Sequence, residues 1–374
     1  MFPELKVGLF RLRLAVRQPM PLPAYKGSVL RGGFGSAFRR VACALRADDC
    51  GGCGLRQACP YAYVFETSPP EGSDVLRTFR DIPRPFVIQP PEDDRTFLEP
   101  GDEMEFGLVL IGRGVSYLPY FVVAFRQLGR TGIGPRRAGF ELAEVRQVAG
   151  PVWAGGAGGV GEEREQGKQG GRSWTVFDGT TDSGEVRVAG VSERCVGAKE
   201  VAAAAARLPS ECIQVTFKTP TRLKAEAALR TRPEFHLLVR ALLRRASSLA
   251  YFHHDRRLEL DYREWIRAAR EVSLLRDETE WVSWRRYSNR QRVRMDLGGV
   301  VGTVVYKGEL GRFRELLLLG ALVHVGKNTT FGLGRYSLDV TDLGRVRKKE
   351  PSRMVGDERS KEAVGPTPND GGMC

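Results

Sequence analysis

The same succession of strand and helix patterns occurs twice in this chain, and a Gly-rich turn stands at the same place in each copy. The turn TGIGPRRAG follows the second helix pattern of the first copy, and VGKNTTFGLG follows that of the second. A strand pattern comes after each turn. This β-α-β-β-α-β order is that of the ferredoxin-like fold. The sequence therefore predicts an α+β protein with two tandem ferredoxin-like (RRM-like, βαββαβ) domains and a Cys-rich insertion.

In the first copy, residues 5–14 and 104–112 have the alternating pattern of half-buried strands. Residues 28–45 and 116–128 have apolar side chains at helical spacing, and 140–148 alternate as the last strand. The second copy has strand patterns and helix patterns over a longer stretch. They lie at 212–219, 233–251, 261–272, 280–287, 298–308, 312–325 and 335–340.

These patterns divide the chain into an N-terminal domain (1–150) and a C-terminal domain (207–344), with a Cys-rich loop at 43–60 in the first. Residues 151–206 are Gly-rich and polar, which predicts a linker or an insertion within a hairpin. Residues 345–374 are charged and lack aromatic side chains, so we expect a disordered tail.

The chain has 374 residues, with 58 Lys and Arg against 45 Asp and Glu. The resulting net charge of +13 favours a polyanionic partner, although a merely soluble basic protein has the same balance. No apolar stretch approaches about 20 residues, so no membrane span is expected. The N-terminus has charged residues where a signal peptide needs its apolar run, which predicts a cytoplasmic protein.

Residues 323–336, VHVGKNTTFGLGRY, follow a helix pattern and precede a strand. A P-loop has the opposite order, strand then helix, so this segment is not one. Consecutive N–H groups in such a turn can still bind an anion. An ordinary tight turn is the alternative. The residues predicted here to contact a phosphate are Gly326, Lys327, Asn328, Thr329, Thr330, Gly332, Gly334 and Arg335.

Residues 285–294 contain five arginines and no acidic residue, with Trp281 and Trp284 just before them. Guanidinium groups beside aromatic rings are typical of single-stranded nucleic-acid binding. The alternative is that the tryptophans are core and the arginines a solvated face. The predicted RNA contacts here are Arg286, Tyr287, Arg290 and Arg292, which Lys218, Arg222 and Lys224 would extend.

Four cysteines, Cys43, Cys50, Cys53 and Cys59, lie within seventeen residues. Their spacing suits a structural zinc site, and an iron–sulfur cluster is the less common alternative. Cys43 could instead be a buried helix residue. Among the four histidines of the chain, none belongs to a paired metal motif, and His324 stands two residues before the first glycine of the loop.

Four segments together resemble the CRISPR-associated endoribonucleases of the RAMP superfamily that process precursor CRISPR RNA. They are YKGSVLRGGFGSAFRRVAC, YAYVFE after the cysteines, RYSNRQRVRMDLGGVVGTVVYKGEL, and VHVGKNTTFGLGRY. The resemblance covers most of both copies but not the Gly-rich region or the tail. It implies tandem ferredoxin-like domains that bind CRISPR repeat RNA. It also implies cleavage without a metal, by attack of the ribose 2′-OH, giving guide RNAs for antiviral defence.

Many members of this family have a catalytic histidine on the first helix, where this chain has Ser36. Lysine or arginine can substitute by stabilising the phosphorane. The catalytic candidates are Tyr25, Lys26, Arg31, Ser36 and His324. The alternatives are a non-catalytic RAMP subunit that binds crRNA among other effector subunits, and a general RNA-binding protein. The resemblance leaves open whether the chain forms a homodimer.

Overall fold

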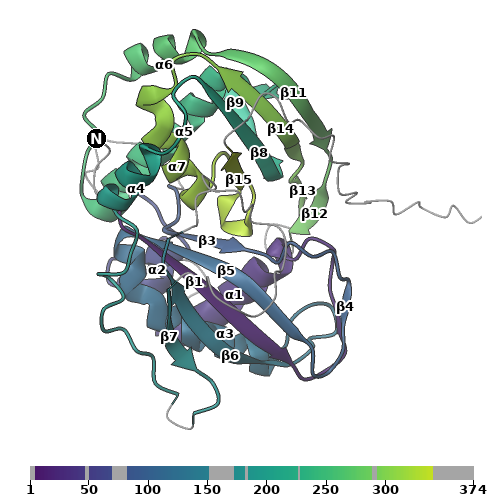
Figure 1. The fold of residues 1–374 in the computed structure, drawn as a ribbon. Coiled ribbons are helices and arrows are strands. Elements are labelled where there is room, and N and C mark those ends of the chain that lie inside the picture. The colour runs from purple at the N-terminus through teal and green to yellow at the C-terminus, as the bar shows by residue number, and fades with distance from the viewer. Residues whose placement is uncertain are drawn as a thin grey trace, which may run out of the picture.

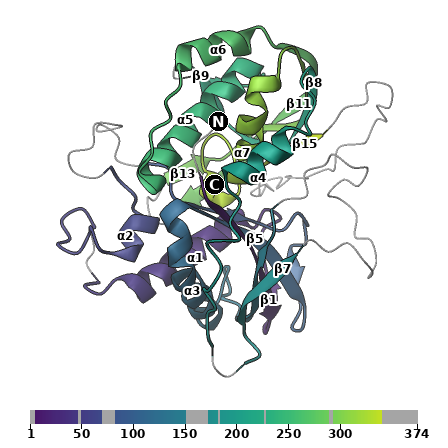
Figure 2. The ribbon, with the colours of Figure 1, turned by 60° about the vertical axis from the view of Figure 1, so that its left-hand side comes forward.

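The structure is a computed structural model, and it describes residues 5–46, 50–69, 82–150, 172–181, 184–225, 228–288 and 293–339. The predicted tail at 345–374 lies outside the described residues, as do residues 151–171 of the predicted linker. Figures 1 and 2 show two views of the ribbon, with the N-terminal half below and the C-terminal half above.

The N-terminal half is an antiparallel sheet with the strand order β3-β5-β1-β6-β7. Its strands are β1 (Val7–Val16), β3 (Phe86–Gln89), β5 (Glu103–Ile111), β6 (Phe140–Val148) and β7 (Ser173–Asp178). The other elements are α1 (Gly27–Ala42), α2 (Pro60–Val64), α3 (Leu118–Thr131), the 3-10 helix η1 (Gly112–Tyr117), and the short pair β2 (Met20–Pro21) and β4 (Phe97–Leu98).

Alternation along β1 separates two faces of this sheet. Phe10 and Leu12 are buried, and α1 and α3 cover that face (Figure 1). Phe34 of α1 stacks on Phe121 and Phe125 of α3, with ring centroids 4.7 and 5.0 Å apart. Rings of this size dominate the burial that holds helices on a sheet. The apolar spacing of α1 is therefore what holds this helix against α3 and the sheet.

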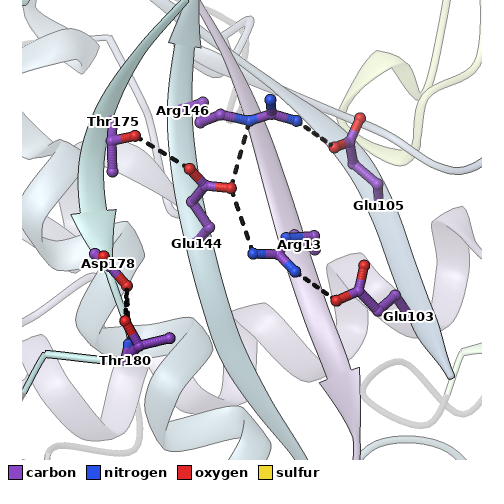
Figure 3. A network of polar contacts seen from close by, with 8 residues as sticks. All are labelled: Arg13, Glu103, Glu105, Glu144, Arg146, Thr175, Asp178 and Thr180. Atoms are coloured by element: carbon purple, nitrogen blue, oxygen red, sulfur yellow. Dashed lines mark hydrogen bonds and ion pairs between the residues drawn. The ribbon is translucent and has the colours of Figure 1, made fainter. Parts of the chain in front are cut away.

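The opposite face of the first sheet has a charged network, shown in Figure 3. Glu144 of β6 lies 3.5 Å from both Arg13 and Arg146, and Arg146 also pairs with Glu105 at 3.0 Å. Arg13 pairs with Glu103 as well. These side chains are partly exposed, and such pairs add little stability each. The network therefore defines a solvated face on which arginines and carboxylates pair.

The C-terminal half is a second antiparallel sheet with the order β11-β14-β8-β15. Its strands are β8 (Cys212–Thr221), β11 (Ser273–Val282), β14 (Gly299–Lys307) and β15 (Tyr336–Asp339). The helices are α4 (Ala198–Ala205), α5 (Phe235–His254), α6 (Tyr262–Arg270), α7 (Arg314–Val323), and the 3-10 helices η2 (Gly311–Phe313) and η3 (Thr329–Phe331). Two short pairs complete it: β9 (Leu223–Ala225) with β10 (Ala228–Arg230), and β12 (Arg285–Ser288) with β13 (Val293–Asp296).

In both sheets the strands of the repeated unit have the spatial order second, third, first, fourth, as in the ferredoxin-like fold. The predicted tandem fold is thus confirmed. The sequence patterns omitted β3, whose apolar run FVIQ has only four residues. The interval 151–206 contains β7, which pairs with β6 at the edge of the first sheet, and α4.

The two halves share buried surface. Val109 and Ile111 of β5, with Val87 of β3, belong to the same apolar cluster as residues of α5 and α7. In Figure 1 the segment after α7, drawn in yellow, lies between the two halves and close to β3. This segment contains the glycines singled out in the sequence, so its contacts decide what those glycines do.

Candidate nucleic-acid interface

The glycine loop, residues 324–335, joins α7 to β15. A Cβ at Gly334, which has a φ of +73°, would overlap the carbonyl oxygen of Val325. A Cβ at Gly332, with a φ of +86°, would overlap Pro90 and lie 2.8 Å from the carbonyl oxygen of Ile88. Only glycine fits such a backbone without strain. These two glycines therefore let the loop pack on itself and on the loop after β3, and neither faces open space.

His324 begins the loop in a conformation that is almost restricted to glycine, with φ 62° and ψ 168°. Its imidazole is fully buried. Gln89 donates its amide N–H to Nε2 at 3.0 Å, and Nδ1 donates to the carbonyl oxygen of Leu333 at 3.1 Å. Burial, followed by the charge of Arg335, lowers the pKa of His324 to about 3. This geometry makes His324 a positioning residue that ties the loop to β3.

Arg245 of α5 binds the backbone of Val323, the residue just before the glycine loop. Its Nε donates to the carbonyl oxygen of Val323, the last residue of α7, at 2.8 Å. Burial lowers the pKa of Arg245 to about 9, because the charged form loses its hydration. A cation at a helix C-terminus satisfies a carbonyl that the helix leaves free. The start of the glycine loop is thus fixed from both α5 and β3.

The residues at the start of α1 pack directly on the glycine loop. Tyr25 donates its hydroxyl to the carbonyl oxygen of Phe331 at 2.8 Å, and burial raises the pKa of that phenol. The guanidinium of Arg31 lies 4.9 Å from the ring centroid of Phe331 and 4.2 Å from that of Phe65. The structure therefore brings Tyr25 and Arg31 into contact with the glycine loop, although about 300 residues separate them from it in sequence.

Lys26 is only 1% exposed, and its Nζ lies 2.9 Å from Oδ1 of Asp93. Burial alone would raise the pKa of Asp93, but hydrogen bonds and charges from Lys26 and Arg95 lower it overall. Ser36 lies on the exposed side of α1, and its Oγ donates to the carbonyl oxygen of Gly32 at 3.3 Å. In this arrangement Lys26 neutralises a carboxylate, and Ser36 has no base among its hydrogen-bond partners in the described residues.

The base of the β12–β13 hairpin contacts the same region. Trp284 packs edge-on against Tyr25, with centroids 4.7 Å apart, and both adjoin the small cluster of Leu297, Phe331 and Leu333. Backbone pairing places Arg286 and Tyr287 on β12, while Arg290 and Arg292 lie outside the described residues. The hairpin therefore extends from the point where α1 and the glycine loop meet.

A basic cluster stands where the glycine loop passes β9 and α5. Partial burial and then the like charges of Lys224, Arg222 and Arg244 lower the pKa of Lys327. The side chain of Lys224 lies within hydrogen-bonding reach of Lys327, and this contact also lowers the pKa of Lys327. Within the described part of the chain, no carboxylate pairs with Lys224 or Lys327. Amines that repel each other in this way favour an anion between them.

The other predicted RNA contacts are distributed unevenly. Lys218 is exposed on β8, and Asn328 is partly exposed. Thr329 and Thr330 are buried, at 6% and 7% exposure, so little of either residue is accessible to a ligand. Arg222 binds the backbone and carboxylate of Asp296, with a distance of 3.2 Å to Oδ2.

Arg335 pairs with Glu92 at 2.7 Å. Sequence inspection missed Gln89, Glu92 and Asp93, which hold His324, Arg335 and Lys26. For Glu92 and Asp93 the one signal is the acidic run EDD, which follows the short strand β3 after two prolines. It also missed Arg244, which is exposed on α5 at helical spacing. Its contribution to the basic cluster depends on a contact with a segment more than eighty residues away.

The four cysteines of the Cys-rich loop are free and half-buried. Cys43 ends α1 and Cys59 precedes α2. Burial raises the pKa of Cys50, and the nearby thiols of Cys43 and Cys59 add to that rise. In the described residues, which exclude 47–49, no three ligating side chains are close enough to hold a metal ion. The structure thus gives the zinc site no support, and it stays a prediction from spacing.

No helix in the described ranges combines the length and the apolar character that crossing a membrane requires. Of the four histidines, His253 and His324 are fully buried, and burial lowers the pKa of both. His253 accepts from the hydroxyl of Tyr63 at 2.9 Å and donates to the carbonyl oxygen of Pro83 at 2.7 Å. It therefore contributes to the contact between the two halves.

Two family models match parts of this chain. Residues 215–336, which include the glycine loop and the hairpin, match the model of the CRISPR-associated endoribonuclease Cas6. Residues 5–165 match an N-terminal domain family designated AF_1859_N. The Cas6 match confirms the resemblance to the CRISPR-associated processing endoribonucleases of the RAMP superfamily that the sequence motifs indicated.

A curated relative and two solved structures add to this comparison. An uncharacterized protein of Archaeoglobus fulgidus is 30% identical over 125 residues, 32% of this chain and 41% of that protein, so the match spans less than half of that relative. A chain of a partial Cas6-RT-Cas1–Cas2 complex is 13% identical with a TM-score of 0.51, over 94% of this chain and 48% of that one. A Thermus thermophilus Cas6 is 14% identical with a TM-score of 0.47, over 89% and 98%.

Proposed function

We propose that this protein is an endoribonuclease that binds CRISPR repeat RNA and cleaves precursor CRISPR RNA without a metal, giving guide RNAs. The observation that carries this proposal is the pair Lys224 and Lys327, two like charges that lie close to each other on the segment that matches Cas6. Two adjacent ammonium groups without a carboxylate partner in the described residues suit a backbone phosphate. The net charge of +13 favours the same class of ligand.

The proposed reaction is internal transesterification. The ribose 2′-oxygen attacks the adjacent phosphorus, the bond from phosphorus to the 5′-oxygen breaks, and the products end in a 2′,3′-cyclic phosphate and a 5′-OH. The proton leaves the 2′-OH and one is delivered to the 5′-oxygen. Such a step gains most from groups that stabilise the charge of the phosphorane.

Among the catalytic candidates, Arg31 is the one we assign to the phosphorane. Its guanidinium is half-buried beside the glycine loop and oriented by two aromatic rings. Tyr25, Lys26 and His324 donate to or neutralise protein groups, so we assign them to holding the loop and α1 together. Ser36, exposed on α1, can only assist through its hydroxyl.

The main test is cleavage of the repeat RNA of the source organism by the purified chain in excess EDTA. We expect a cyclic-phosphate end, and no cleavage when the scissile nucleotide is 2′-deoxy. Arg31→Ala should lower the cleavage rate roughly 100-fold with RNA binding retained. Arg40→Ala, which removes an exposed arginine of the same helix, is the matched control and should stay near the wild type. Tight binding without any cleavage would contradict the enzymatic proposal.

A non-catalytic RAMP subunit that binds crRNA in an effector complex is the second candidate. One observation favours it: no histidine of the chain is an exposed general base. His253 and His324 are buried, His254 is partly buried, and His236 lies 3.4 Å from Glu234 with a pKa that burial lowers. The assay above separates the two proposals, because a subunit would bind the RNA and leave it intact.

A further inference from the structure

A recess lies at the edge of the first sheet, away from the glycine loop. Its volume is about 680 Å³, within the range of roughly 300–1,000 Å³ that is typical of ligand pockets. Strand β7 forms one wall, and the segment 185–194 forms the other. The side chains that matter for its chemistry are those of Trp174, Thr175, Glu185, Arg187, Val188 and Arg194.

Arg194 is fixed inside this recess. Its guanidinium lies 5.0 Å from the ring centroid of Trp174. Its Nε donates to Oε1 of Gln147 at 3.2 Å, and a terminal NH2 donates to the carbonyl oxygen of Ala189 at 2.9 Å. Gln147 is completely buried, and its own amide donates to the carbonyl oxygen of Val191 at 2.9 Å. A surface arginine is ordinarily mobile, so this one is preorganised over the indole.

The backbone around Arg194 is shaped for the same contact. Gly190 has a φ of +72°, and a Cβ there would lie 2.7 Å from a terminal nitrogen of Arg194. Arg187 is exposed on the wall opposite β7, and Val188 is 53% exposed beside it. The recess thus combines an aromatic ring, an oriented guanidinium, a second cation and an exposed apolar group, and the one carboxylate among its described lining residues, Glu185, leaves an excess of positive charge.

We propose that this recess, the Trp174 pocket, binds a nucleotide of a single-stranded RNA extension that flanks the segment held at the glycine loop. Aromatic rings with arginines stack on bases and contact phosphates without needing a particular sequence. The inference rests on the proposed function, since it assigns a second contact to the same RNA. An acidic protein segment is the other ligand class that two arginines could attract, and the aromatic ring favours RNA over it.

The test compares two RNAs, the repeat segment alone and the same segment with a single-stranded extension of about ten nucleotides. Wild-type protein should bind the extended RNA more tightly, and Arg194→Ala and Trp174→Ala should each remove that gain, at least about fivefold. Trp174→Phe should retain most of it. The matched control is Arg312→Ala, because Arg312 lies 5.2 Å over the ring of Trp265 outside this pocket. It should leave both affinities unchanged.

A 4-thiouridine placed in the extension gives a second readout that does not depend on folding of the variants. We expect ultraviolet crosslinks on β7 or on residues 185–194 of the wild-type chain. Equal affinity for the two RNAs, or crosslinks confined to other segments, would overturn the pocket and leave the proposed function standing. If the wild type bound neither RNA, the proposed function itself would fail. Capture of an acidic peptide in place of RNA would also overturn the inference.

Discussion

The two Gly-rich turns occupy the same place in the two copies of the fold but have different surroundings. The first, residues 132–139, closes by a bridge between Ile133 and Ala138 and leaves Arg136 and Arg137 exposed. The second, the glycine loop, is longer, and it packs on α1 and on the loop after β3 of the other half. Equivalent positions in a topology can thus serve as a local turn or as the contact between domains, depending on what faces them.

The first residue of each turn makes the difference concrete. Gly132 follows α3 with φ 79° and ψ 157°, and His324 follows α7 with nearly the same angles. A non-glycine residue in this region costs about 1–3 kcal/mol. At His324 this cost is offset by the hydrogen bonds of the imidazole with Gln89 and with the carbonyl oxygen of Leu333. At the first turn the equivalent residue is Gly132, which has no side chain to anchor and adopts these angles without strain.

The largest expected effect is on Gly334. Gly334→Ala should lower the free energy of unfolding by at least about 3 kcal/mol, because its Cβ meets the carbonyl oxygen of Val325 in a positive-φ conformation. Gly134 in the first turn also has a positive φ, but a Cβ added there by Gly134→Ala would lie 3.1 Å from its nearest neighbour, the carbonyl oxygen of Pro21. It should cost only about 1 kcal/mol. Urea unfolding of both variants measures the difference, and equal losses would contradict the comparison.

The second effect is the pH dependence of stability. The pKa of His324 is about 3 in the folded protein, below its usual value near 6.5, so the unfolded chain binds more protons as the pH falls. The folded state should lose about 2 kcal/mol through this group between pH 7 and pH 5. His324→Gly should remove that part of the acid sensitivity and leave the part due to His253. Urea unfolding at the two pH values checks this.

A companion variant tests the strain at the same position. His324→Ala loses the imidazole but retains the Cβ, so at pH 7 it should be less stable than His324→Gly by about 1 kcal/mol. At an unstrained position, a protein with alanine is normally more stable than the same protein with glycine. The opposite order would show that the backbone at this position is not strained.

The third effect concerns RNA affinity. Lys224→Ala with Lys327→Ala should weaken RNA binding about tenfold and reduce the slope of log K against log salt by about 1.4, since each lost phosphate contact contributes about 0.7. Arg136→Ala with Arg137→Ala removes the same charge from the first turn and should change neither quantity appreciably. Titrations at several salt concentrations give both values, and equal slopes for the two double variants would contradict the assignment of Lys224 and Lys327 to phosphate contacts.

The smallest effect is at Tyr25. Tyr25→Phe removes the hydroxyl that donates to Phe331 but keeps the ring contact with Trp284. The expected loss of stability is about 1 kcal/mol, with cleavage within a few-fold of the wild type. A cleavage loss of 100-fold or more at unchanged affinity would instead make Tyr25 a catalytic residue.

Much of the fold could be read from periodicity. Strand β6 coincides with its predicted range, and α1, α3 and β5 differ from theirs by a few residues at the ends. These elements are long and have one buried face, so their apolar spacing is informative. Strand β3 was missed because four residues are too few to define a period. Its absence from the prediction also removed Gln89 and the acidic loop that follows, which hold the predicted site residues.

The sequence by itself determined the repeated order of elements, the excess of positive charge and the Gly-rich segment before the last strand, because these depend on local spacing and composition. Only the tertiary structure decided that Gly332 and Gly334 face protein backbone, that His324 and Lys26 are buried, and that Lys224 approaches Lys327. Those outcomes depend on which distant segments are neighbours. Burial and like-charge repulsion are properties of that neighbourhood, and no spacing along one chain records them.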